Sequence, residues 1–413
     1  MREQGPAESG IPACKGGEAG SSIAAHGCIV GIQPRPDPGP PTPNVRPERF
    51  LVIKLADLGD ALTVTPALRA LRTTFPSART DVLVTPAGAA VLAGLDSIDR
   101  CVLFEKAPFD RLRPTMRPIA AAVALGLKLR RGRYDRVFLL HHLFTAAGRL
   151  KYAALLGATG APWRAGIAED QPAFLTDVLP DGGYGVRHEA DYWLDVVGLV
   201  GAANPAPRIE VQIGGEAQAR ASRLLDASRD GGQRPRIALY PGAGSYSLAR
   251  RWPADRFAEV ARRLVESAGA QIVVVGGRTE RELAESICAS VGRACRDLAG
   301  LTDVKTLAAV LSQCDLFVGN DGGVMHLAVA AAVPTVAVFG PSNDISWGPY
   351  GGARWQPGVA TRSVVVRADL ACAPCMYRGY LPGTRHGCRD RDCLTSVGID
   401  TVLQAAHALL TLT

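Results

Sequence analysis

The sequence has 413 residues, of which 47% are hydrophobic and 21% are charged, with 45 glycines and 29 prolines. This length and composition predict a globular protein of two or three domains and exclude a collagen-like, a wholly disordered or a small disulfide-stapled protein. Lysine and arginine number 46 against 39 aspartates and glutamates. The net charge of +7 suits anionic ligands but is too diffuse to indicate a nucleic-acid-binding surface.

Residues 1–46 contain little apolar periodicity and are rich in proline from position 34 to position 43, which predicts a disordered tail. The first residues lack the charged start and compact apolar stretch of a secretory signal, so we expect a cytoplasmic protein. In that compartment the 10 cysteines should be mostly reduced. The longest apolar run, residues 119–127, is too short to span a membrane and is soon followed by arginines.

From residue 50 onward, short apolar runs alternate with amphipathic stretches, which is typical of parallel sheets covered by helices on both faces. We predict strands at 50–55, 81–85, 100–105 and 136–141, and helices at 61–75, 115–131, 145–156, 189–199 and 214–227. After a polar linker at 228–235, a second series has strands at 236–240, 271–275, 315–318 and 335–339, and helices at 253–267, 280–291, 302–312 and 323–332. The predicted fold class is α/β, with two Rossmann-like doubly wound domains, at 47–229 and 230–396, facing a central cleft.

The loop after the first strand carries two aspartates, Asp57 and Asp60, at or near the start of the following helix. An aspartate there usually caps the helix, a contribution of about 1 kcal/mol. The alternative is that one of the two carboxylates points into the cleft and removes a proton from a substrate hydroxyl. Ligands of open α/β sheets bind beyond the carboxyl ends of the strands, which is where both residues lie.

The loop after strand 236–240 begins Pro-Gly-Ala-Gly and continues with Ser245 and Ser247, followed by Arg250. Small residues let the backbone approach an anion, hydroxyls donate to phosphate oxygens and the arginine supplies a cation, so the loop suits a phosphate. An ordinary glycine-rich turn is the alternative. The loop has neither the Gly-Lys-Ser/Thr ending of a Walker A sequence nor the glycine pattern of a dinucleotide site.

Residues 318–327, Val-Gly-Asn-Asp-Gly-Gly-Val-Met-His-Leu, join a strand end to a helix. Gly322 and Gly323 leave the helix amides accessible, while Asp321 and His326 add polar groups that packing does not require. The pattern indicates a diphosphate or nucleotide site, against the alternative of a plain turn and a buried histidine. Glu280, after strand 271–275, is predicted either to accept hydrogen bonds from a ribose or to cap its own helix.

Four cysteines near the C-terminus stand at short spacings, at Cys372, Cys375, Cys388 and Cys393. Thiols paired in this way suit a tetrahedral sulfur site for zinc or iron. Free thiols or a conditional disulfide are the alternatives, because the gap within the second pair is wider than in a standard zinc ribbon. The remaining cysteines are predicted to be ordinary small hydrophobic residues.

Several motifs occur together in one order. They are the loop 54–60 followed by Thr-Pro-Ala-Leu-Arg at 65–69, Pro-Gly-Ala at 241–243 with Arg-Trp-Pro at 251–253, the segment 319–328, and Phe-Gly-Pro at 339–341. In order and spacing the chain resembles glycosyltransferase family 9, the ADP-heptose:lipopolysaccharide heptosyltransferases, from about residue 49 to about residue 395. The resemblance implies a GT-B architecture, with the acceptor bound mainly by 47–229 and the nucleotide-sugar donor by 230–396. It also implies a final helix, within 397–413, that packs back on the first domain.

On this resemblance, Asp60 is the base of an inverting transfer of heptose, or a related sugar, from an ADP-sugar to a hydroxyl of a lipopolysaccharide-core-like saccharide. The donor-binding positions fall on Ser245, Ser247, Arg250, Glu280, Asp321, Gly322, Gly323 and His326. No paired Asp-x-Asp motif stands at a strand end, so no catalytic metal is expected and the four-cysteine segment would be structural. The chain departs from the family's usual residues in having Gly322 for Thr or Ser, Tyr240 for His, and Arg250 for Lys.

Other assignments share this architecture. A heptosyltransferase of this kind could act on a protein or a small-molecule acceptor, and a sugar-nucleotide epimerase or hydrolase would use the same donor cleft without an acceptor. A non-catalytic sugar-nucleotide sensor is a third class. A basic run could meet acceptor or lipid phosphates and give a peripheral contact with the inner membrane, or it could be the solvated end of a helix; it consists of Lys128, Arg130, Arg131 and Arg133.

Overall fold

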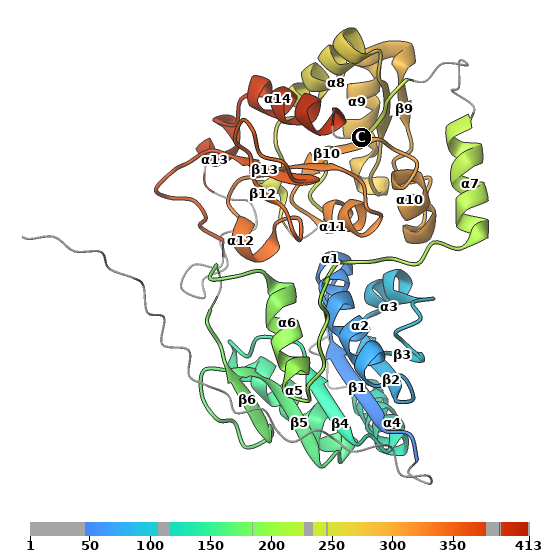
Figure 1. Cartoon of the computed structure of the whole chain (residues 1–413), viewed down its shortest axis with the longest axis vertical. Coiled ribbons are helices and arrows are strands. Elements are labelled where there is room, and N and C mark those ends of the chain that lie inside the picture. The colour runs from blue at the N-terminus through green and yellow to red at the C-terminus, as the bar shows by residue number, and fades with distance from the viewer. Residues whose placement is uncertain are drawn as a thin grey trace, which may run out of the picture. The chain divides into compact units, whose positions relative to one another are not determined.

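The computed structural model describes residues 46–105, 116–183, 185–226, 234–244, 247–376, 388 and 390–411, and the structural statements below concern these residues. Nearly all of the predicted tail and most of the predicted linker lie outside the described residues. The chain from Pro47 onward belongs to one unit, in which two parallel sheets follow one another along the sequence (Figure 1).

The first sheet has six described strands, all paired in parallel, in the order β3-β2-β1-β4-β5-β6. The strands are β1 (Arg49–Lys54), β2 (Arg79–Val84), β3 (Arg100–Leu103), β4 (Arg136–Leu139), β5 (Trp163–Ala168) and β6 (Asp177–Pro180). Val52 of β1 stands opposite Val82 on one side and Phe138 on the other. β1 is an almost continuous apolar run because helices cover both faces of the sheet. The strand order reverses between β1 and β4, the position where such sheets bind ligands.

The helices of this half include a break that the sequence analysis did not predict. They are α1 (Leu58–Leu62), α2 (Thr65–Thr74), α3 (Pro86–Leu92), α4 (Met116–Gly132), α5 (Ala146–Thr159) and α6 (Glu189–Gly198). The predicted helix 61–75 is divided because Pro66 has no amide hydrogen to donate to the carbonyl of Leu62. The hydroxyl of Thr65 donates to that carbonyl instead, at 2.8 Å. α1 is therefore a separate short helix at the carboxyl end of β1.

The second sheet has seven described strands, again all paired in parallel, in the order β12-β13-β11-β10-β7-β8-β9. The strands are β7 (Arg236–Tyr240), β8 (Gln271–Val274), β9 (Cys295–Asp297), β10 (Leu316–Asn320), β11 (Thr335–Phe339), β12 (Ala353–Arg354) and β13 (Ser363–Arg367). The strand order reverses between β7 and β10, so the second switch point lies beyond Tyr240 and Asn320.

The α-helices that accompany this sheet are α7 (Gly215–Asp226), α8 (Ala254–Ala268), α9 (Arg281–Val291), α10 (Val304–Leu311), α11 (Gly323–Ala330), α12 (Asp344–Trp347), α13 (Asp392–Thr395) and α14 (Ile399–Leu410). Three short 3-10 helices are also described, η1 (Leu248–Arg250), η2 (Arg278–Glu280) and η3 (Gly292–Ala294). In the described part of the chain, no helix combines the length and the apolar character needed to cross a membrane.

The last helix, α14, packs on the second sheet and does not make the predicted return to the first domain. Its buried residues Val402 and Leu409 share a core with strands of that sheet, and Arg263 of α8 pairs with Asp400 at 2.7 Å. The apolar face of α14 is therefore buried against the second sheet and α8. α7, which the predicted boundary at 229 assigns to the first domain, packs against α10 of the second half.

Two of the cysteines predicted to be reduced and merely hydrophobic are joined in a disulfide. Cys288 of α9 and Cys295 of β9 are bonded, with their Cα atoms 5.1 Å apart. The turn η3 between the two elements brings them together, which spacing alone did not indicate. The other cysteines in the described part of the chain are reduced.

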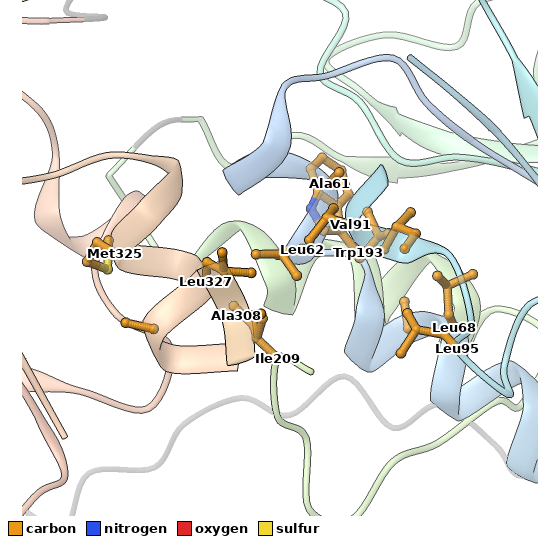
Figure 2. Close-up of a cluster of buried hydrophobic side chains, with 14 of the residues drawn as sticks. Ala61, Leu62, Leu68, Val91, Leu95, Trp193, Ile209, Ala308, Met325 and Leu327 are labelled. Carbon is orange, nitrogen blue, oxygen red and sulfur yellow. The ribbon is translucent and has the colours of Figure 1, made fainter. Parts of the chain in front are cut away.

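One hydrophobic core includes residues from both halves. Figure 2 shows Ala61 and Leu62 of α1 in the same cluster as Leu327 of α11, and all three side chains are fully buried. Nearby, the ammonium group of Lys305 in α10 donates to the carbonyl of Val91 in α3 at 3.0 Å. These contacts fix the start of α1 against the start of α11.

Candidate active site

The switch points of the two sheets open on one cavity of about 510 Å³. The first half contributes residues 57–60 at the start of α1, and the second half contributes residues 321–324 at the start of α11. α1 follows β1 and α11 follows β10, and both strands lie in the centre of their sheets. The starts of the two helices therefore line the same cavity. The cavity therefore brings together residues predicted from separate motifs, namely Asp60, Arg250, Asp321, Gly322, Gly323 and His326.

Asp60 lies within the first turn of α1, half-buried, and is not the helix cap. Asp57 holds the cap position, but its side chain accepts no capping hydrogen bond from the amides of α1. Burial raises the pKa of Asp60 to about 6, against the lowering effect of the positive charge of Lys54. A carboxyl group that titrates near neutrality suits a general base, because it is ionised at working pH yet binds a proton well. The geometry favours the base hypothesis over the capping one.

A buried polar network that the sequence analysis missed lies next to Asp60. Burial lowers the pKa of Lys54, at the end of β1, while the charges of Glu189 and Asp60 oppose that effect. The Lys54 ammonium lies 4.0 Å from the ring centroid of Trp193. His142 bonds Glu189 through Nε2 at 3.1 Å, while its Nδ1 bonds a second carboxylate. The sequence signal for this network was a lysine at the carboxyl end of a buried strand, because burying a charged group is costly unless an opposite charge or a hydrogen-bond partner lies beside it.

Asp321 organises the second wall of the cavity. Its Oδ2 accepts from Arg250 Nη1 at 3.2 Å and from the hydroxyl of Ser342 at 2.5 Å. Arg250 Nη2 donates to the carbonyl of Ala243 at 2.9 Å. The guanidinium group is thereby held in the cavity wall in a fixed orientation. Ser342 was not predicted; the Phe-Gly-Pro sequence that precedes it at the end of β11 was its only signal.

The starts of α1 and α11 approach so closely that two glycines have no room for a side chain. A Cβ on Gly59 would lie 2.8 Å from Cδ2 of His326 and 3.1 Å from the Cα of Gly323, and a Cβ on Gly323 would lie 3.3 Å from the amide nitrogen of Gly59. Gly322 differs, because a Cβ there would meet its nearest neighbour, in Tyr240, at an ordinary 3.5 Å. Packing therefore does not explain why this chain lacks a hydroxyl at position 322.

Two cavity residues have a buried ring nitrogen with no hydrogen-bond partner in the described structure, Nδ1 of His326 and Nε1 of Trp347. Burial lowers the pKa of His326 to about 4, and the charges of His188 and Arg250 act in the same direction. The imidazole is therefore neutral at physiological pH and can hydrogen-bond a bound ligand. Trp347 belongs to α12, a four-residue helix too short for the sequence pattern to indicate.

Two predicted donor-binding residues that the structure describes, Glu280 and Ser247, do not line the cavity. Glu280 is buried and accepts from the amide of Gly277 at 2.9 Å and from Arg251 at 3.2 Å, so here it holds its own short helix. Ser247 is buried next to η1 and does not line the cavity in the described structure. Ser245 lies outside the described residues.

The four-cysteine segment is separate from the cavity lining. Burial, together with the charges of Cys375, Cys388 and Cys372, raises the pKa of Cys393 to about 11, which indicates that the four thiols are near one another. Within the described residues, however, no three histidine, cysteine, aspartate or glutamate side chains are arranged to hold a metal ion. As placed here, the thiols do not fit the predicted tetrahedral site.

Comparison with known proteins identifies the family. The model of glycosyltransferase family 9 (heptosyltransferase) matches residues 122–379, more than half of the chain. Lipopolysaccharide heptosyltransferase 2 of Salmonella typhimurium is 28% identical over 305 residues, which are 71% of this chain and 83% of that protein. Lipooligosaccharide heptosyltransferase 2 of Campylobacter jejuni is 37% identical over 178 residues, 42% of this chain and 50% of that protein.

The fold is similar to that of a solved relative. The structure of Escherichia coli ADP-heptose LPS heptosyltransferase II has a TM-score of 0.66 to this one at 22% identity, covering 88% of this chain and 99% of that chain. This likeness confirms the α/β class and the GT-B arrangement of two Rossmann-like sheets. Since the family match covers more than half of the chain, from within α4 to the first pair of clustered cysteines, the chain belongs to glycosyltransferase family 9 and is a glycosyltransferase.

Proposed function

We propose that this enzyme transfers heptose, or a closely related sugar, from an ADP-sugar to a hydroxyl of a lipopolysaccharide-core-like saccharide, with inversion at the anomeric carbon. The relatives named above are heptosyltransferases of lipopolysaccharide or lipooligosaccharide, which supports both the donor and the acceptor class. The observation that carries the proposal is a single cavity with Asp60 on one wall and Arg250 beside the start of α11 on the other.

In this reaction the Asp60 carboxylate accepts the proton of the acceptor hydroxyl as the hydroxyl oxygen attacks the anomeric carbon. The bond from that carbon to the β-phosphate oxygen breaks in the same step, and its electron pair leaves with the diphosphate. The products are the glycoside, ADP and protonated Asp60, which then releases its proton to solvent. Because base and leaving group lie on opposite walls, attack comes from the face opposite the diphosphate and inverts the configuration.

The second wall supplies the groups that stabilise the leaving diphosphate. Arg250 is oriented by Asp321 and the carbonyl of Ala243, and the amides of Gly322 and Gly323 stand at the positive end of the α11 dipole. We propose that these groups make a catalytic metal unnecessary, with the donor bound mainly by 230–396 and the acceptor by 47–229. Turnover that persists in EDTA supports this, and a strict requirement for an added divalent cation contradicts it.

The experiment that tests the function has two stages. Thermal stabilisation by ADP, UDP and GDP is measured first, and ADP is expected to give the largest shift in melting temperature. ADP-heptose is then supplied with and without a heptose-deficient lipopolysaccharide core, and products are followed by mass spectrometry. We expect ADP release only with the acceptor, and NMR of the product should show the inverted anomer. Donor consumption without acceptor would instead indicate a hydrolase or epimerase.

For the four-cysteine segment we propose a structural role, as a site for zinc or iron. A bound ion would have to draw the thiols closer together, since the described side chains are not arranged for a metal. The proximity of the other three thiols to Cys393 and the softness of sulfur ligands support the proposal. We expect about one zinc or iron per chain by elemental analysis, lost in Cys393→Ser; a metal-free parent protein would contradict the proposal.

We further propose that the enzyme works in the cytoplasm at the surface of the inner membrane, where a lipid-linked acceptor would be met. The support is α4, which exposes Val123 (56%) and Leu127 (51%) next to its basic end. In vesicle cosedimentation, Val123→Gln with Leu127→Gln should reduce binding. Leu301→Gln, an exposed leucine of the other half, is the control. Equal binding by all variants would contradict the proposed contact.

A further inference from the structure

A second cavity lies at the amino ends of the strands of the first sheet, at the end opposite to the cavity that holds Asp60. Its volume is about 400 Å³, and we call it the basic pocket. It is lined by Arg49, Arg79, Asp81, Arg100, Lys128, Arg131, Gly132 and Tyr134. Arg49, Arg79 and Arg100 are the first residues of β1, β2 and β3, and the other two cations lie near the end of α4. β1 has six residues, so it separates this pocket from Asp60 by about 20 Å.

One buried carboxylate, Asp81, anchors the pocket wall. Asp81 is 1% exposed and pairs with Arg100 at 2.5 Å and with Arg79 at 3.2 Å. The hydroxyl of Tyr134 also donates to Asp81, at 2.9 Å. The pair of arginines is thus fixed in position while each side chain stays more than 40% exposed. A single carboxylate cannot balance both guanidinium groups, so positive charge remains at the pocket.

The other three cations add to that excess. Arg49 donates to the carbonyl of Gly132 at 3.1 Å, which orients its guanidinium without neutralising it. Lys128 and Arg131 are exposed, and no described carboxylate pairs with either. Two carboxylates near this edge are engaged elsewhere: Asp135 accepts the backbone amide of Arg49, and Glu48 pairs with Arg136.

A favourable interaction with the helix dipole explains only part of this arrangement. Basic residues in the last turn of α4 are expected, because cations stabilise the C-terminal end of a helix. The dipole does not account for arginines at the starts of three neighbouring strands that line the same cavity. Five cations around one carboxylate repel one another, and that cost is removed when a multivalent anion enters.

We propose that the basic pocket is a binding site for a phosphate group, either of a soluble phosphorylated molecule or of an anionic lipid headgroup. Arginine forks suit the tetrahedral oxygens of phosphate, and the lysine supplies a further charge. The volume admits a phosphate with a small attached group. The site is independent of the proposed transfer chemistry, because it shares no residue with the cavity that holds Asp60.

The test compares two full-length variants that lose the same charge from the same end of α4. Lys128→Gln with Arg131→Gln removes two pocket cations, whereas Arg130→Gln with Arg133→Gln removes two cations outside the pocket lining. Both variants keep the pairing of Asp81 with Arg79 and Arg100, so both should fold. Pyrophosphate is titrated by calorimetry in excess ADP, which occupies the proposed donor site. Binding to vesicles of phosphatidylglycerol in phosphatidylcholine is measured in parallel.

We expect the pocket variant to bind at least one of the two probes about tenfold more weakly than the control variant. A selective loss with pyrophosphate alone identifies a soluble ligand, and a selective loss with the vesicles identifies a lipid headgroup. Equal affinities of the two variants in both measurements would overturn the proposal, because the effect would then be general surface charge. This comparison between variants stands whether or not ADP proves to be the donor nucleotide.

Discussion

The two walls of the active-site cavity are built from the same kind of element and carry opposite chemistry. In each half a helix starts beyond a strand at the switch point, α1 after β1 and α11 after β10. The first turn of α1 carries a carboxylate, Asp60, whereas α11 starts at glycines beside Arg250. A helix start favours negative charge in both places. On the first wall the carboxylate of Asp60 occupies the helix start. On the second wall the carboxylate of Asp321 is paired with Arg250, and we propose that the substrate's diphosphate binds at the start of α11.

One architecture can thus place a proposed base and a proposed leaving-group site in the same cavity. Burial raises the pKa of Asp60 to about 6, which suits the proposed role as proton acceptor, and the charge of Lys54 keeps the pKa from rising further. Arg250 needs no such adjustment, because a guanidinium group is always charged. Substitutions that change one wall at a time can therefore separate the contributions of the two walls.

Asp60→Asn should remove the base and leave the second wall intact. We expect the rate of transfer to fall by about 10²-fold or more, while ADP binding by calorimetry stays close to that of the parent. Asp57→Asn, a change of the same kind three residues earlier on the same wall, should cost far less. If Asp57→Asn abolished transfer and Asp60→Asn did not, the base would have been assigned to the wrong carboxylate.

Gly59→Ala should push the two walls apart. The new Cβ would lie 2.8 Å from the ring of His326 and 3.1 Å from the backbone of Gly323, and overpacking of this kind costs about 1–3 kcal/mol. We expect a lower melting temperature and roughly tenfold slower transfer. The matched control is Gly157→Ala in α5, where a Cβ meets nothing within 4 Å. A Gly59→Ala enzyme as stable and active as the control would show that the helix starts need not touch.

Lys54→Met should move the pH dependence of transfer. The base must be ionised, so kcat/KM should decrease when the pH is lowered below the pKa of Asp60, which is about 6 in the parent. Removing the neighbouring positive charge raises that pKa, and the acid limb should move up by about one pH unit. Lys151→Met, on the exposed side of α5, should leave the limb in place. If the acid limb of the pH profile did not move in Lys54→Met, the charge of Lys54 would have no influence on the pKa of the base.

Gly322→Ser should strengthen donor binding on the second wall. A Cβ at this position meets only ordinary contacts, at 3.5 Å or more, and the hydroxyl could donate to a phosphate oxygen. We expect the KM for the donor to fall by about three- to tenfold. Gly323→Ser is the comparison: its Cβ would lie 3.3 Å from the backbone of Gly59, so that variant should lose activity. Weaker donor binding in Gly322→Ser would mean that this position does not face the phosphates.

The sequence predicted the alternation of strands and helices because buried parallel strands leave long apolar runs. It missed the break at Pro66, since only the three-dimensional path shows that α1 stands apart from α2. It also missed β6, β9 and β12, which are short and only partly buried, and it overlooked β5 and β13, which are longer and mostly buried. The partner of α14 could not be predicted, because an amphipathic pattern shows that a face is buried but not against what.

The site was predictable where residues lie at strand ends in recognisable motifs. Asp60, Arg250 and Asp321 meet in one cavity because the carboxyl ends of both sheets face it. Ser342 was missed because its only signal was the preceding Phe-Gly-Pro, and Trp347 was missed because it lies in the four-residue helix α12. For Glu280 the sequence left two roles open, a ribose contact or a cap of its own helix, and the structure shows its bonds to Gly277 and Arg251.

A crystal structure of the enzyme with a non-transferable ADP-2-deoxy-2-fluoro heptose and an acceptor saccharide would show whether Asp60 and the start of α11 hold the two substrates as proposed. We expect the diphosphate at the start of α11 against Arg250, and an acceptor hydroxyl within hydrogen-bond reach of Asp60, about 3 Å, on the opposite side of the anomeric carbon. A donor bound with its sugar directed away from α1, leaving Asp60 out of reach of the acceptor, would contradict the account.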